Sequence, residues 1–134
     1  MRVVLDTNVL IAAFISHGTC HEVLERCIYH HDLISSQAIL SEFRQALARK
    51  FGFSRSEIAE AEQLMQSRMI LVEPLRLDVP VCRDVDDDLI LGTALAGQCQ
   101  CLITGDQDLL ALVRYRGIDI ISPGSFWQYE GAGG

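Results

Sequence analysis

Residues 3–8 read Val-Val-Leu-Asp-Thr-Asn, an apolar run that leads directly to a carboxylate. An uninterrupted run of apolar and β-branched residues predicts a short strand that is buried on both faces. Asp6 stands where this strand stops, and we see no helix cap for it to make. A buried acid without such a role needs a partner. We therefore interpret Asp6 as a candidate functional residue.

Further apolar runs predict four more strands, at residues 32–35, 69–72, 101–104 and 118–121. Segments with helical periodicity separate them, at residues 9–15, 19–28, 37–50, 55–67, 89–97 and 107–113. Short apolar strands that alternate with helices indicate a parallel sheet covered on both faces. We therefore expect an α/β fold, a three-layer α/β/α domain with a central, mainly parallel sheet of about five strands.

The chain has 134 residues, of which 49% are hydrophobic and 22% charged. That length and balance fit one globular domain, which we assign to residues 1–128. The glycine-rich residues 129–134 are expected to form a flexible C-terminal tail.

The formal net charge of −7 argues against a broad basic surface for nucleic acid. It does not exclude a nucleic-acid substrate, because a bound metal ion would offset acidic ligands. Any phosphate contact would come from a local basic strip, for which Arg44, Arg49, Lys50 and Arg55 are the candidates. The alternative is an ordinary solvated helix face.

Five cysteines are an odd number, and Met1-Arg2 leads into the first predicted strand without a signal peptide. Both features predict a reduced, cytoplasmic protein. No apolar run approaches the roughly 18 residues that span a bilayer, so no membrane association is expected.

More acids stand at junctions like that of Asp6. Glu42 lies one turn into the predicted helix at 37–50, residues 84–88 form an acidic run before another helix, and Asp106 and Asp108 follow the fourth strand. Ligands of open parallel sheets bind beyond the carboxyl ends of the strands, so these acids are expected to gather around Asp6. Taken singly, the acids at helix starts could be caps, and Glu42 could be a surface acid.

Carboxylates that converge repel one another unless a cation or a proton neutralises them. Oxygen ligands without a nearby histidine or cysteine favour Mg²⁺ or Mn²⁺ over zinc. Such ions promote phosphodiester hydrolysis by lowering the pKa of a bound water and stabilising the leaving oxygen. The acids therefore predict a metal-dependent hydrolase that needs no side-chain nucleophile.

Four segments carry a resemblance to a known family: LDTNVL at 5–10, SEF at 41–43, DVDDDLILGTALAG at 84–97 and LITGDQDLL at 102–110. In this order and spacing they resemble the PIN domain, and most closely the VapC-like toxins of prokaryotic toxin–antitoxin modules. The resemblance runs from Val3 to Phe126.

The resemblance implies a metal-dependent ribonuclease, an endoribonuclease that cuts RNA with Mg²⁺ or Mn²⁺. The residues that match its catalytic and metal-binding acids are Asp6, Glu42, Asp87 and Asp106. The residues that match supporting positions are Asn8, Thr104 and Asp108. It further implies a homodimer and an inhibiting antitoxin.

The third acid requires a choice among Asp86, Asp87 and Asp88, and alignment with the family's helix selects Asp87. The resemblance implies that Asn8 and Thr104 orient Asp6 and hydrogen-bond water or ligands.

The sequence leaves two alternative functions. In the first, the protein is a non-catalytic interaction protein whose acidic cleft receives a basic partner segment. In the second, Asp6 is the nucleophile of a phosphotransfer enzyme. The second would favour an acid at position 8 or a lysine after a later strand, whereas position 8 is Asn and the only lysine is Lys50 on a predicted helix.

Overall fold

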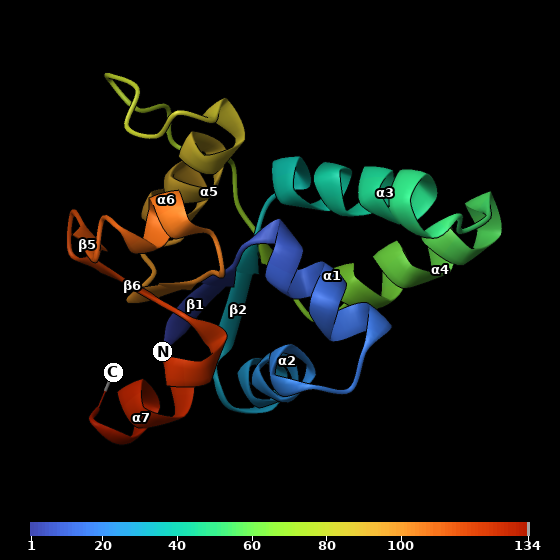
Figure 1. Cartoon of the computed structure of the whole chain (residues 1–134), viewed down its shortest axis with the longest axis horizontal. Helices are drawn as coiled ribbons and strands as arrows, with labels where there is room; N and C mark the ends of the chain where they lie inside the picture. Colours follow the sequence, from blue (N-terminus) through green and yellow to red (C-terminus); the bar gives the residue numbers. More distant parts are fainter. Residues whose placement is uncertain (134) are drawn as a thin grey trace.

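A computed structural model describes residues 1–133 (Figure 1). Its centre is a six-stranded sheet in the order β3-β2-β1-β4-β6-β5. The strands are β1 (Arg2–Leu5), β2 (Asp32–Ser35), β3 (Ile70–Leu71), β4 (Cys101–Ile103), β5 (Arg114–Tyr115) and β6 (Ile118–Ile121). All neighbouring strands are parallel except β5 and β6. The expected α/β/α fold class is confirmed.

Helices lie on both faces of the sheet (Figure 1). They are α1 (Thr7–Ile15), α2 (Thr19–His30), α3 (Gln37–Phe51), α4 (Arg55–Gln66), α5 (Val85–Ala96), α6 (Gln107–Leu110) and α7 (Phe126–Gly131), with a 3-10 turn at Pro123–Ser125 before α7. Helices α3 and α4 pack together beside α1. No helix within residues 1–133 is both long enough and apolar enough to cross a membrane.

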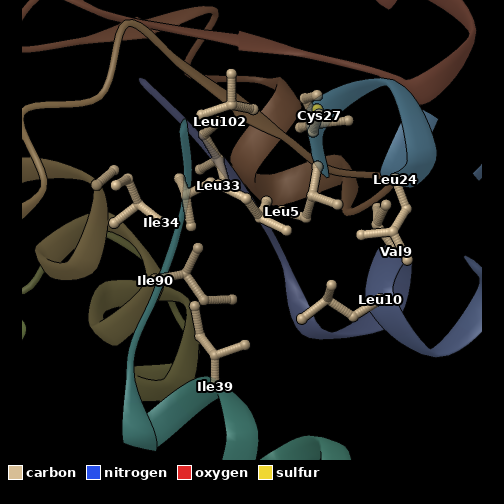
Figure 2. Close-up of a cluster of buried hydrophobic side chains, with 14 of the residues drawn as sticks. Leu5, Val9, Leu10, Leu24, Cys27, Leu33, Ile34, Ile39, Ile90 and Leu102 are labelled. Atoms are coloured by element: carbon tan, nitrogen blue, oxygen red, sulfur yellow. The ribbon is translucent and has the colours of Figure 1, made fainter. Parts of the chain in front are cut away.

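Strand β1 is the middle of the core because it pairs with β2 on one side and β4 on the other. Val4 pairs with Ile34 and with Leu102, and all three side chains are fully buried. Figure 2 shows alternate side chains of β2 on opposite faces of the sheet, Leu33 toward α1 and α2 and Ile34 toward α5. Burial on both faces explains why the strands read as continuous apolar runs.

The sheet has six strands where about five were expected. The helix predicted over 107–113 ends at Leu110, and Val113 adopts a φ of 61° that turns the chain back along β6. Gly117, with a φ of 84°, closes the turn between β5 and β6. A strand of two residues, Arg114–Tyr115, leaves no apolar run in the sequence.

The C-terminal segment also differs from the expected tail. Tyr129 and Glu130 belong to α7, and Glu130 accepts hydrogen bonds from Arg26 (2.9 Å) and lies 2.5 Å from His31 Nε2. The hydroxyl of Tyr129 donates to Asp119 at 2.7 Å. These contacts anchor the start of the predicted tail, and its last residue, Gly134, lies outside the described residues.

Candidate active site

Asp6 lies at the carboxyl end of β1 and is 2% exposed. Its Oδ1 accepts a 2.9 Å hydrogen bond from the amide of Val9, and its Oδ2 accepts one from the Thr104 hydroxyl. Asp6 is thus the N-cap of α1, which starts at Thr7 and not after Asn8. The expectation that Asp6 has no cap to make was therefore wrong, because the helix begins at Thr7, directly after Asp6, and not at Val9.

Thr104 joins Asp6 to Asp106. While its hydroxyl donates to Asp6, the same oxygen accepts a 3.0 Å hydrogen bond from the Asp106 amide. Asp106 caps α6 through Oδ1, which accepts from the amides of Asp108 (2.9 Å) and Leu109 (3.1 Å). Its capping role leaves Oδ2 available to a ligand.

Three acids from α5 and α6 approach one another closely. Oxygens of Asp87, Asp106 and Asp108 all lie within 4.8 Å of each other. Asp108 is also bound by Arg83, whose Nη2 donates at 2.7 Å and whose Nε donates at 3.3 Å. The guanidinium holds the pKa of Asp108 below its usual value, so the charge of this acid is already balanced.

The acidic run divides into different roles. Asp84 caps α5 by accepting from the Asp86 amide at 2.9 Å. Asp88 accepts from the amides of Val81 (3.1 Å) and Cys82 (2.8 Å), which ties the preceding loop to α5. Asp87 is the member of the run that lies with Asp106. This geometry favours Asp87 over Asp88 as a ligand.

Glu42 faces the site from α3. Its Oε1 accepts from the Thr7 hydroxyl at 3.3 Å. Glu42 and Asp86 line a cleft of about 210 Å³ together with Asn8, Arg49 and Lys50. Glu42 thus shares its cleft with Asp86, whereas the close group of acids consists of Asp87, Asp106 and Asp108.

Burial and mutual repulsion raise the pKa values of the central acids. For Asp6, burial is the main cause, opposed by the Thr104 and Val9 hydrogen bonds and reinforced by Asp106. Burial and then Asp106 raise the pKa of Asp87 to about 6. Burial and then Asp86 raise the pKa of Glu42 to about 7. A bound cation would relieve all three shifts.

A family model described as PIN domain matches residues 2–108. The chain belongs to the PIN domain family. The match includes every acid of the candidate site, from Asp6 to Asp108.

Two solved structures share the fold of this PIN domain. The structure of VapBC2 from Rickettsia felis, bound to a DNA fragment from its promoter, has 16% sequence identity and a TM-score of 0.66. That of FitAcB from Neisseria gonorrhoeae has 16% identity and a TM-score of 0.55. In both comparisons 91% of this chain and 98% of the other are aligned. A search of curated proteins found no significant match.

The donor set of the PIN domain suits a hard divalent cation. The close group of Asp87, Asp106 and Asp108 offers carboxylate oxygens only, and Asp6 is coupled to it through Thr104 and Asp106. Oxygen ligands of this kind suit Mg²⁺ or Mn²⁺. The residues present therefore fit the ion that the family resemblance implies.

Asn8 is placed differently from the expectation. Its side chain is exposed in the cleft beside Glu42 and makes no hydrogen bond to Asp6 within the described part of the PIN domain. The backbone amide of Asn8 helps to lower the pKa of Asp6, and Thr104 is the side chain that orients it.

Three residues of the site have contacts or positions that were not predicted from the sequence. Thr7 binds Glu42, Arg83 binds Asp108, and Asp86 lies across the cleft from Glu42. The sequence carried a signal for Asp86 alone, as a member of the acidic run.

Proposed function

We propose that this PIN domain is a divalent-metal-dependent ribonuclease and the toxin of a toxin–antitoxin module. The observation that carries the proposal is the approach of Asp87 to Asp106, which Thr104 connects to the buried Asp6. Repelling acids in a fixed arrangement at the carboxyl end of a parallel sheet form a preorganised cation site.

In the proposed reaction, Asp6, Glu42, Asp87 and Asp106 would hold Mg²⁺ or Mn²⁺, which would supply a water of lowered pKa and neutralise charge on the phosphodiester. Thr104 and the Val9 amide fix both oxygens of Asp6, so its orientation is set before substrate binds. The two amides that hold Asp106 Oδ1 similarly direct its other oxygen.

The toxin role rests on the shared fold. VapBC2 and FitAcB have the same fold over nearly their whole matched chains. From the shared fold we infer that the protein binds an antitoxin and forms a homodimer in the cytoplasm.

Incubation of purified protein with an RNA pool and Mn²⁺ tests the proposal. The wild-type protein is expected to cleave, chelation of the metal is expected to stop cleavage, and Asp6→Asn is expected to reduce it by about a hundredfold or more. Asp78→Asn, an exposed aspartate outside the site, is the control. Equal cleavage by Asp6→Asn and wild type would assign the activity to a contaminant.

One observation favours the non-catalytic alternative, because Arg83 already binds Asp108 at the edge of the site. A basic partner segment could bind the remaining acids in the same way. Melting curves separate the two functions. A rise in Tm with Mn²⁺ supports the metal site, whereas a rise with an arginine-rich peptide and none with Mn²⁺ supports the interaction protein.

A further inference from the structure

The cleft beside Glu42 contains two cations as well as acids. We call it the α3 cleft, because Glu42, Arg49 and Lys50 all project from that helix. Asn8 and Asp86 also line it. An opening with acids at one end and cations at the other differs from the group of Asp87 and Asp106, which contains carboxylates alone.

The charges of Arg49 and Lys50 are free to meet a ligand. Both residues are exposed, and neither forms an ion pair with any acid in residues 1–133. Arg44, five residues before Arg49, is by contrast bound by Glu62. Of the predicted basic strip, Arg49 and Lys50 therefore combine a free charge with a place in the cleft.

Their spacing from Glu42 fits a ligand that extends along α3. Arg49 is seven residues and Lys50 eight residues after Glu42, which corresponds to about 10–12 Å along a helix axis and a similar face. The three side chains line one opening without pairing. A group bound at Glu42 therefore lies about two turns from the cations, so the cations would meet a neighbouring part of the same ligand.

An RNA strand is an extended ligand that could lie along α3 in this way. Its charges repeat along the chain, so a phosphate at the acidic site brings others into the cleft. With a net charge of −7 the protein as a whole repels such a polyanion. Local cations beside the acids would offset the repulsion and orient the strand.

We propose that Arg49 and Lys50 bind backbone phosphates of the RNA next to the phosphodiester that is cut, an inference that rests on the proposed function. Both are positioning residues. Arg49 offers a planar fork and Lys50 a point charge, and both groups bind phosphate oxygens. Backbone contacts carry no base information, so the contribution is independent of RNA sequence.

A structural role needs a separate control. Both residues lie in the last turn of α3, where cations interact favourably with the helix dipole. Loss of that interaction would lower Tm. It would not change how RNA binding depends on salt, which counts phosphate contacts.

The test is fluorescence anisotropy of the full chain with labelled oligouridine and oligoadenosine over a salt series. The binding buffer contains Ca²⁺ in place of Mg²⁺, because Ca²⁺ is also a divalent cation that binds oxygen ligands. Four proteins are compared: wild type, the double variant Arg49→Gln/Lys50→Gln, the charge-retaining Arg49→Lys/Lys50→Arg, and Arg55→Gln, which removes an exposed charge outside the cleft.

The double glutamine variant is expected to bind both RNAs about tenfold more weakly at moderate salt, with the slope of log K against log salt reduced by about 1.4, or about 0.7 for each lost contact. The charge-retaining variant and Arg55→Gln are expected to keep the wild-type slope. A lower Tm with an unchanged slope would assign the two residues a structural role and overturn the inference.

Three other results would also overturn it: no RNA binding by wild type, an equal loss in Arg55→Gln, or a double variant that loses binding of an acidic peptide and not of RNA. A failure of the proposed function can be distinguished from a failure of this inference. If wild type does not cleave RNA but the slope changes as expected, the backbone contact stands and the nuclease does not. If wild type cleaves and the slope is unchanged, the inference alone fails.

Discussion

Asp6 combines a capping role with a proposed role in metal binding. Asn retains an oxygen that caps α1 and removes the charge beside Asp106, whereas Ala removes both. In the absence of metal, Asp6→Asn is expected to melt at or above the wild-type Tm. Asp6→Ala is expected to be less stable than Asp6→Asn by about 0.5–2 kcal/mol. Thermal and denaturant unfolding of the three proteins measure the difference, and equal stability of the two variants would contradict the capping role.

Glu42 and Asp87 predict a pH effect on the metal-free protein. Burial raises the pKa of Glu42 to about 7 and that of Asp87 to about 6, above the ordinary values of 4.5 and 3.8. Between the ordinary and the raised pKa of each acid, the folded state binds more protons than the unfolded state. These acids therefore reduce the free energy of unfolding as pH rises. Tm in the presence of a chelator is expected to be higher near about pH 5 than near about pH 7.5 because of them.

The variant Glu42→Gln isolates this contribution from that of other titrating groups such as His21. Its Tm difference between the two pH values is expected to be smaller than that of wild type, since it lacks a carboxyl that titrates in the window. An equal difference in both proteins would show that Glu42 has an ordinary pKa.

Local sequence predicted which acids stand at strand ends, but it did not predict the hydrogen bonds that hold the site together. Asp6 and Asp106 follow apolar strands, and the carboxyl ends of β1 and β4 are neighbours because these strands pair. The partners Thr7 for Glu42 and Arg83 for Asp108 lie 35 and 25 residues away. Such contacts depend on tertiary packing, and no local pattern marks them.

At the scale of elements, Gly92 fixes the position of α5 and so of Asp87. The amide of Leu75 donates to the Gly92 carbonyl at 3.0 Å, and a Cβ at Gly92 would overlap the carbonyl oxygen of Leu75. Gly92→Ala is expected to cost about 1–3 kcal/mol, because backbone must move to make room. Cleavage is expected to fall as well, since the movement displaces Asp87.

Gly131→Ala is the matched control, because it is also a helical glycine and a Cβ there meets nothing within 4 Å. It is expected to leave Tm unchanged or slightly higher. If Gly92→Ala has the same stability as this control, the close approach of the loop to α5 is not a constraint.

The starts of α3 and α4 carry side-chain caps that local sequence marks, whereas the cap of α1 at Asp6 was missed. Ser36 accepts from the Ile39 amide, and Ser54 with Glu57 forms a capping box. Strand β5 was not predictable, because it depends on the positive φ of Val113, which is unusual for a β-branched residue.

At the scale of the whole molecule, the alternation of apolar strands with helices was enough to predict the layers. Burial on both faces leaves a clear apolar signature in β1, β2 and β4. The structure of the C-terminal segment was not predicted in this way. Its glycines suggested a tail, yet Glu130 binds Arg26 across 104 residues of chain.

The central claim is that the acids at the carboxyl end of the sheet bind a divalent cation. Anomalous scattering from a crystal soaked in Mn²⁺ tests it most directly. A peak is expected within about 2.0–2.4 Å of oxygens from Asp87 and Asp106, with Asp6 directed toward it and Glu42 across the cleft. The absence of a peak there, with Mn²⁺ bound elsewhere or not at all, would contradict the claim.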